Sequence, residues 1–188
     1  MRNLAGSKRA LSLTAILLLW GSAMFFVDGC SRIPLNYLPS SVNKISGSVS
    51  VSNFKYLLAE TGDVKPFQIR NTALEKLKFD KNIDVYFREA VSAELRLSGV
   101  KIDDKTRVLS GEIEDLLVDD LSFDNAHWIM RVHYIIKDLR TGNTLYVSTK
   151  TTQCDASKLM NVSSAFNDVI KLNVEELMKD EAFIKAIH

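Results

Sequence analysis

The chain of 188 residues lacks the short motifs that carry most enzyme chemistry. It contains no G-x-S-x-G elbow, no Walker loop, no G-x-G-x-x-G turn and no H-E-x-x-H helix. It also lacks a run of basic residues interleaved with aromatics, and its formal net charge is only +1. Because phosphate binding needs a clustered positive field, we expect no nucleic-acid partner. The absent motifs favour a protein that is not an enzyme and that needs no cofactor.

Cysteine and histidine are scarce as well. Cys30 and Cys154 are the two cysteines, and in an exported protein they could form a disulfide. If a lipid occupies Cys30, Cys154 is expected to be a half-buried or surface thiol at the end of a strand. His127 and His133 are expected on one strand face, about 20 Å apart and too distant to bind one metal ion. His188 is the last residue.

Acidic residues gather twice without forming a recognisable site. Asp119, Asp120 and Asp124 precede a strand, but the glycine pivot and later glutamate of a calcium loop are missing. We expect a polar hairpin loop there. Glu112 and Glu114 should face the same side of a strand, where they would act as solubilising charge rather than as paired catalytic carboxylates.

The N-terminus carries the clearest pattern in the sequence. Arg2, Lys8 and Arg9 precede the stretch LSLTAILLLWGSAMFFV, residues 11–27, which has no charge. A basic start followed by such an apolar run fits a secretory signal or a short membrane span. Because the basic flank lies before the run, the N-terminus is expected to stay cytoplasmic and the folded part to lie outside the cytoplasm.

The end of the apolar run, Val27-Asp28-Gly29-Cys30, resembles the lipobox of bacterial lipoproteins. The resemblance implies that the Cys30 thiol receives a diacylglycerol, that the chain is cut before Cys30, and that the new α-amine is acylated. Asp28 departs from the pattern, which usually has a small uncharged residue there. Ser31 is not aspartate, and by resemblance to the sorting rule of enteric-type bacteria this implies the outer rather than the inner membrane. An uncleaved single-span anchor and a soluble periplasmic protein cut elsewhere are the alternatives.

The composition places the remaining chain in one domain behind a tether. Residues 1–29 are predicted to be the signal peptide. Residues 30–44, with two prolines and several small polar residues, are predicted to be the lipidated N-terminus and a flexible tether. Residues 45–188 are predicted to be a single domain facing the periplasm, because a hydrophobic content of 46% is enough to fill a core.

Apolar periodicity predicts the elements of this domain. Alternation predicts strands over 46–57, 106–123, 127–138 and 144–153, and helical spacing predicts helices over 83–99 and 161–188. A break near Asp180 should divide the second helix, with Asp180 as a cap, and Gly99 should end the first. The order β-α-β-β-β-α predicts an α+β two-layer sandwich, in which a mostly antiparallel sheet of about four strands carries two main helices on one face.

The same periodicity predicts which side chains form the core. Alternate residues from Trp128 to Ile136 form an apolar face that should pack on the helices. In the first helix, Glu94 is expected on the polar face, opposite the apolar stripe. In the last helix, Leu172 is expected within the apolar stripe. The segment between the first strand and the first helix should be a loop or a short edge strand.

The arrangement behind the lipobox resembles the YajG-type outer-membrane lipoproteins. The resemblance rests on FREAVSAELRLSGV followed by VLSGEIEDL, and on the tail SAFNDVIKLNVEELMKDEAFIKAI. It implies an envelope location and an α+β fold but no mechanism. A looser similarity links the chain to auxiliary lipoproteins of envelope lipid transport.

We therefore expect a non-catalytic interaction module, anchored to the membrane through Cys30. A protein partner would meet a sheet face, an edge strand or the loop around residues 60–80. The alternative is a lipid- or envelope-component-binding accessory of a transport or assembly machine. A solvent-open groove lined by Trp128 and Phe166 would favour that alternative.

Overall fold

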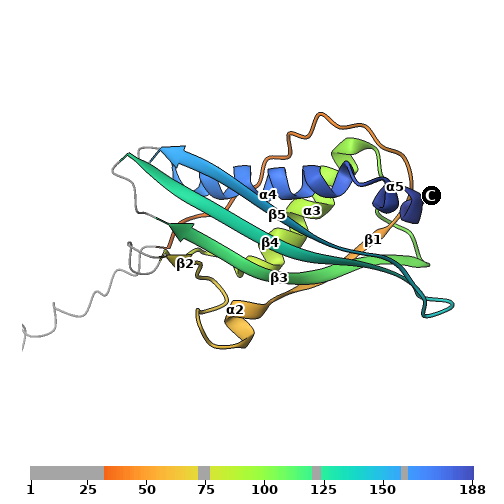
Figure 1. The fold of residues 1–188 in the computed structure, drawn as a ribbon, viewed down its shortest axis with the longest axis horizontal. Helices are drawn as coiled ribbons and strands as arrows, with labels where there is room; N and C mark the ends of the chain where they lie inside the picture. The colour runs from red at the N-terminus through yellow and green to blue at the C-terminus, as the bar shows by residue number, and fades with distance from the viewer. Residues whose placement is uncertain (1–31, 72–76, 120–123, 158–160) are drawn as a thin grey trace, which may run out of the picture. The chain divides into compact units, whose positions relative to one another are not determined.

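The computed structural model describes residues 32–71, 77–119, 124–157 and 161–188. The predicted signal peptide, Cys30 and Asp120 lie outside the described residues. Nine helices and strands follow one another along the described chain (Figure 1). They are β1 (Ser50–Tyr56), α2 (Leu57–Glu60), β2 (Arg70–Asn71), α3 (Ile83–Ser98), β3 (Arg107–Asp119), β4 (Asn125–Asp138), β5 (Thr144–Ser157), α4 (Val162–Met178) and α5 (Glu181–Ile187).

The sheet is built on three long strands, β3, β4 and β5, which form an antiparallel meander. The short strands β1 and β2 both run parallel to β3, on the edge of β3 opposite β4. β1 pairs with residues 108–113 and β2 with residues 117–118, so the two short strands follow one another along one edge. The predicted α+β two-layer sandwich is confirmed, and β2 is a short edge strand in the segment where one was considered.

The core lies on one face of this sheet, against the helices. The alternate residues from Trp128 to Ile136 on β4 are buried, as their spacing predicts. Helix α3 contacts β1, and α4 contacts β4 and β5, so the two main helices cover this face (Figure 1). The ring of Phe54 on β1 lies over Gly111 of β3, where a Cβ would also come within 2.0 Å of the His133 carbonyl oxygen. A glycine is therefore required at this crossing.

The two predicted helix-end signals, Gly99 and Asp180, are confirmed. Gly99 ends α3 in the left-handed conformation, with a φ of 104° that costs glycine little. The Asp180 carboxylate accepts a hydrogen bond from the Ala182 N–H at 2.9 Å, which caps α5 as predicted. Asn82 is the N-cap of α3 by position, but its side chain makes no capping hydrogen bond.

Residues 33–44, called the strap below, differ from the predicted flexible tether. Leu35 is 4% exposed, and the strap runs along the helical layer from one end of the domain to the other (Figure 1). Hydrogen bonds hold it in place: Tyr37 of the strap donates to Glu94 on α3, and Ser163 on α4 donates to Pro34 of the strap. The packed unit extends from Arg32 to His188. The domain therefore begins about a dozen residues before the boundary predicted at residue 45.

Candidate interaction surfaces

The chain first becomes fixed to the domain at Ile33. The Ile33 N–H donates to the Lys78 carbonyl oxygen at 2.8 Å, and the Asp80 N–H donates to the Ile33 carbonyl oxygen at 3.0 Å. The next contact follows two residues later, where the Leu35 N–H donates to the Asp80 carboxylate at 2.9 Å. Only Ser31 and Arg32 separate this fixed point from Cys30.

A buried carboxylate on α3 holds the middle of the strap. The Glu94 side chain is fully buried and accepts hydrogen bonds from the Tyr37 hydroxyl at 2.6 Å and the Ser41 N–H at 2.9 Å. The Ser40 N–H adds a third bond at 3.1 Å. Burial, followed by the bond to Glu94, raises the pKa of Tyr37 well above its usual value, so the phenol stays a donor.

Cationic and aromatic side chains surround the point where the chain enters the domain. The Arg32 guanidinium lies 4.5 Å from the centre of the Phe67 ring, which is a cation–π geometry. The Phe67 carbonyl oxygen accepts from the Phe79 N–H at 2.9 Å, directly beside the Ile33 contact. Lys65 is exposed on the same loop, and Lys81 forms an exposed ion pair with Glu89 at 3.1 Å.

The outer face of the sheet is polar and carries several ion pairs. Arg131 on β4 pairs with Glu114 on β3 at 3.0 Å, and Lys55 on β1 lies 3.8 Å from Glu112. Arg70 on β2 pairs with Asp115 at 2.9 Å. The predicted solvent-facing acids of β3 therefore neutralise basic side chains on three neighbouring strands. A register shift between Ile113 and Asp115 lets consecutive acids reach different partners.

The histidines lie on this surface, as expected from their spacing. His127 stands opposite Asp119 of β3 and Asp155 of β5, and its Nδ1 lies 2.6 Å from the Asp155 carboxylate. The two paired side chains are 40% and 69% exposed. His133 lies further along β4, against Thr149. In the described part of the chain, no three His, Cys, Asp or Glu residues are grouped so that they could hold a metal ion.

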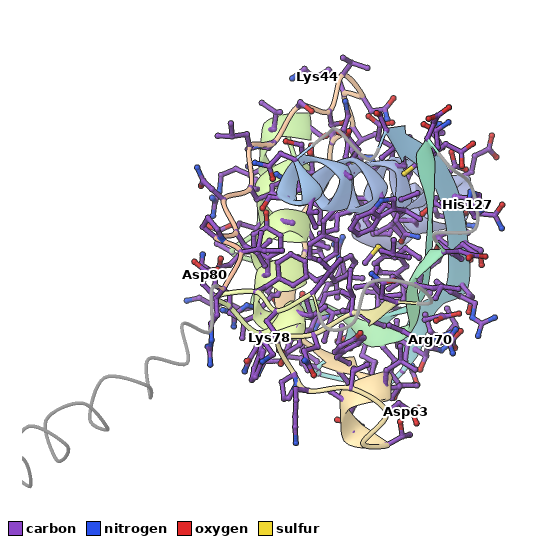
Figure 2. All side chains as sticks on the ribbon, turned by 90° about the vertical axis from the view of Figure 1, so that its left-hand side faces the viewer. Lys44, Asp63, Arg70, Lys78, Asp80 and His127 are labelled. Atoms are coloured by element: carbon purple, nitrogen blue, oxygen red, sulfur yellow. The ribbon has the colours of Figure 1, made fainter. Side chains whose placement is uncertain are left out.

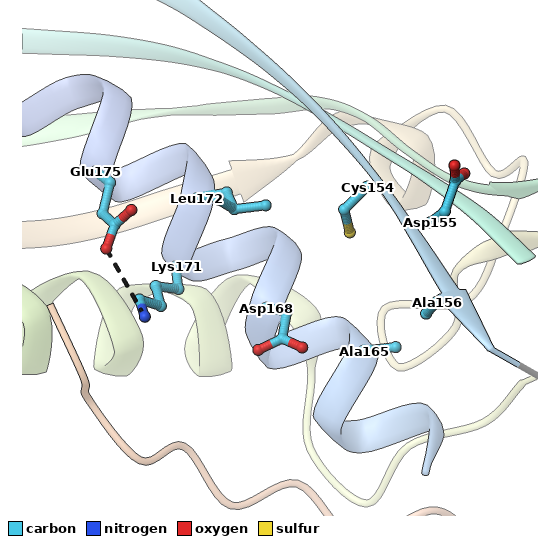
Figure 3. Close-up of a pocket in the computed structure, with 8 residues that line it drawn as sticks. All are labelled: Cys154, Asp155, Ala156, Ala165, Asp168, Lys171, Leu172 and Glu175. Atoms are coloured by element: carbon cyan, nitrogen blue, oxygen red, sulfur yellow. Dashed lines mark ion pairs between the residues drawn. The ribbon is translucent and has the colours of Figure 1, made fainter. Parts of the chain in front are cut away.

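A shallow pocket of about 290 Å³ lies between β5 and α4 (Figure 3). Cys154 lines one wall from β5, while Asp168, Lys171 and Glu175 line the other from α4. Burial, then the nearby Asp168 and Asp155 carboxylates, raise the pKa of the Cys154 thiol to about 11. The thiol therefore stays protonated at neutral pH and is a poor nucleophile, and its partial burial agrees with the predicted half-buried or surface thiol.

The groove that would favour a lipid-binding accessory is filled. Trp128 is 2% exposed and Phe166 is fully buried. Their rings stack with centres 6.1 Å apart, and Phe166 also contacts the rings of Phe79 and Tyr86 at 5.3 and 5.6 Å. These aromatic side chains occupy the space between sheet and helices, so this region belongs to the core.

Sequence reasoning placed two helical residues on the wrong faces. Glu94, expected on the polar face of α3, is buried beneath the strap, and Leu172, expected in the core, is 37% exposed. The neighbouring Asn173 is buried in its place. A signal for Glu94 was present in the spacing, because it falls three residues after Val91 and one before Leu95, within the buried stripe.

The fold is similar to several solved structures, although no family model and no curated protein matches the chain. A Xanthomonas campestris protein assigned to the family model DUF330 superposes with a TM-score of 0.63 at 9% identity, covering 82% of this chain and 96% of that one. The PelC dodecamer subunit from Paraburkholderia phytofirmans gives 0.41 at 13% identity, covering 74% and 92%. A minor lipoprotein from Acinetobacter baumannii gives 0.36 at 13% identity, covering 76% and 94%. At these identities, the first likeness establishes the fold alone.

Within the described ranges, no helix is both long and apolar enough to cross a membrane. Any membrane attachment through the N-terminal 31 residues falls outside these ranges.

Proposed function

We propose that the protein is a lipoprotein of the bacterial envelope, anchored in the outer membrane through lipid on Cys30. Its domain would face the periplasm and act as a non-catalytic interaction module. The observation that carries the proposal is the position of Cys30. It follows a basic start and an apolar run, and it stands three residues before Ile33, where the folded domain begins. The lipid would confine the domain to the membrane plane and raise its effective concentration toward membrane partners.

The chemistry of the described surfaces supports an interaction role. The raised pKa of Cys154 makes its thiol a poor nucleophile, and His127 is already paired with the exposed Asp155 carboxylate, so neither side chain favours a catalytic role. Among the described strands, β5 ends the sheet, so its outer edge offers a site where an extended partner segment could add a strand. Exposed apolar side chains at the β4–β5 hairpin, Leu139, Leu145 and Val147, adjoin that edge.

Replacing Cys30 tests the anchor. Cys30→Ala is expected to abolish incorporation of radiolabelled palmitate and to release the protein into the soluble periplasmic fraction. Cys154→Ala is the matched control, because it removes the other thiol and should leave both labelling and fractionation unchanged. A Cys30→Ala protein that still fractionates with membranes would show that the lipobox interpretation is wrong.

A second substitution tests the membrane assignment. Ser31→Asp should shift the acylated protein from outer-membrane to inner-membrane fractions on a density gradient, if the enteric-type sorting rule applies. Affinity purification of the anchored protein, with mass spectrometry of copurifying proteins, would then identify the partner.

A further inference from the structure

The short link between Cys30 and the fixed domain restricts how the domain can lie on the membrane. Ile33 is held by backbone hydrogen bonds to Lys78 and Asp80, and three residues of chain span at most about 10 Å. A lipidated Cys30 has its backbone at the headgroup level. The end of the domain around Ile33 would therefore be held within about 10 Å of the lipid headgroups, whichever way the link bends.

Given the lipid anchor proposed above, we propose that this end of the domain docks directly onto the bilayer surface. The docking surface consists of Arg32, Lys65, Phe67, Lys78 and Lys81, and its partner is the layer of anionic phospholipid headgroups. Its components come from three places in the sequence: the start of the strap, the loop before β2 and the segment before α3. The hydrogen bonds of Ile33, Phe67 and Phe79 bring them together.

The side chains of this surface suit a headgroup layer. The Arg32 guanidinium covers the half-buried Phe67 ring, so a cation and an aromatic ring share one exposed position. Aromatic rings and long basic side chains are favoured at membrane interfaces, because their apolar parts sit among acyl chains while their polar ends stay hydrated. Lys65 and Lys81 are also exposed.

The rest of this end of the domain sets the orientation. Figure 2 looks onto it and shows Lys78 and Asp80 on one side and His127 on the other. The His127 side carries the carboxylates of Asp119 and Asp155, which an anionic surface repels. Arg70, the cation labelled on this side in Figure 2, is already paired with Asp115. Asp80 and Glu89 are acids beside the docking surface; the Asp80 carboxylate already accepts the Leu35 N–H, and Glu89 is paired with Lys81. The basic side should therefore turn toward the membrane and the acidic side away from it.

The charges of the docking surface can act on the membrane because the link keeps them close to it. At physiological ionic strength, charges beyond about 8 Å are largely screened, but the link keeps this surface near that range. Each basic residue near an anionic surface contributes about a fivefold gain in membrane affinity. The β4–β5 hairpin lies at the opposite end of the sheet (Figure 1). Nine strand residues separate Ile129, beside the β2 row, from Asp138, so the hairpin can lie up to about 30 Å further from the bilayer.

Spin labels on the acylated full-length protein test this orientation. In a Cys154→Ala background, nitroxides are attached at Lys81→Cys and at Lys137→Cys, an exposed lysine near the hairpin. The protein is reconstituted into phosphatidylethanolamine–phosphatidylglycerol vesicles, and the collision rate of each label with an aqueous nickel chelate is measured. We expect the label at residue 81 to be severalfold less accessible than the label at residue 137.

A linker insertion provides the matched control. Twenty Gly/Ser residues placed between Ser31 and Arg32 add about 25 Å of average reach and leave Arg32 over the Phe67 ring, so the label at residue 81 should become more accessible. Arg32→Glu with Lys65→Glu should raise its accessibility without the linker, whereas Lys137→Glu with Lys185→Glu, introduced in the protein labelled at residue 81, should not.

The outcomes separate the docking surface from the anchor itself. The mass of the N-terminal peptide from the same sample reports acylation. An unacylated chain contradicts the proposed anchor. An acylated chain whose labels at residues 81 and 137 are equally accessible contradicts the docking surface and leaves the anchor intact.

Discussion

Asn173 is fully buried on α4, and its side-chain amide forms hydrogen bonds to both strands beneath it. The amide oxygen accepts from the Tyr134 hydroxyl of β4 at 2.8 Å. The amide nitrogen donates to the Thr152 hydroxyl at 3.1 Å and to the Lys150 carbonyl oxygen at 3.2 Å, both on β5. Because buried polar groups need partners, this network favours one placement of α4 over the sheet.

Asn173→Ala is expected to lower the free energy of unfolding by about 3 kcal/mol. It leaves the Tyr134 hydroxyl without its acceptor, removes the bonds to β5 and opens a small cavity. Urea denaturation of residues 33–188 measures the change. Gln153→Ala, at an exposed position of β5, should cost much less. Asn173→Ala combined with Tyr134→Phe should be less destabilised than the sum of the two single variants. An additive result would contradict the network.

The burial of Glu94 and Asn173 could not be predicted from residue type alone. Glu94 and Asn173 belong to classes that are usually exposed, and a single sequence does not reveal partners that fold onto them. The partner of Asn173 lies 39 residues away, and that of Glu94 lies 57 residues away. Glu94 was predicted on the polar face although its spacing also fits the buried stripe, and only the fold supplies the Tyr37 and Ser41 donors that make its burial tolerable.

At the scale of elements, α5 is fastened to the sheet by one carboxylate. The Asp180 side chain accepts from the Lys150 ammonium at 2.6 Å and the Tyr146 hydroxyl at 2.8 Å, and it caps its own helix through Ala182. Partial burial acts to raise the pKa of Asp180, but these three hydrogen bonds outweigh it and lower the pKa to about 2. The ionised form is therefore favoured in the folded protein.

The lowered pKa of Asp180 predicts a loss of stability in acid. An unfolded aspartate titrates near pH 3.9, so the contribution is fully present above that pH and is lost as the pH falls toward 2. The shift corresponds to about 2 kcal/mol. Asp180→Asn should therefore lower the free energy of unfolding at pH 7, and its deficit should shrink toward pH 2.

Unfolding curves measured across this pH range check the Asp180 prediction. Asp155→Asn, at a largely exposed carboxylate, is the control and should show a smaller deficit at pH 7. A difference between wild type and Asp180→Asn that stayed constant from pH 7 to pH 2 would contradict the linkage.

The elements themselves were largely predictable, but their pairing was less so. Alternation in β3, β4 and β5 follows from which side chains face the core, and a strand's own residues encode that. The turn between β4 and β5 contains Gly142, whose φ of 74° suits a tight hairpin connection. Alternation does not identify a neighbour, so the parallel pairing of β1 and β2 with β3 came only from the structure.

At the scale of the whole molecule, the strap changes where the domain begins. Its prolines and small polar residues have the composition of a linker, but a linker also needs freedom from the domain surface. Ser163 on α4 donates to the Pro34 carbonyl oxygen at 2.7 Å, and the amide of Asn167 donates to the Asn36 carbonyl oxygen at 3.0 Å. With Glu94 on α3, both main helices hold the strap. Side chains of the two helices form hydrogen bonds with backbone groups of the strap, and bonds of this kind produce no periodic pattern in the strap's sequence.

The strap is expected to be part of the stable fold. A fragment of residues 45–188 loses the three donors of Glu94 and uncovers the surface beneath Leu35, compared with residues 33–188. We expect a loss of about 4 kcal/mol, and a melting temperature about 10 °C lower by circular dichroism, because each kilocalorie lost shifts a domain of this size by a few degrees.

Glu94→Leu distinguishes the loss of the strap's hydrogen bonds from the other effects of removing residues 33–44. In residues 33–188 the substitution leaves the Tyr37 hydroxyl and the Ser40 and Ser41 N–H groups without their acceptor, so it should be strongly destabilising. In residues 45–188 those three donors are absent, so the same substitution should change the free energy of unfolding little. Equal melting temperatures for the two parent fragments would mean that the strap is a tether after all. An equal effect of Glu94→Leu in both fragments would place the role of Glu94 within α3 rather than at the strap.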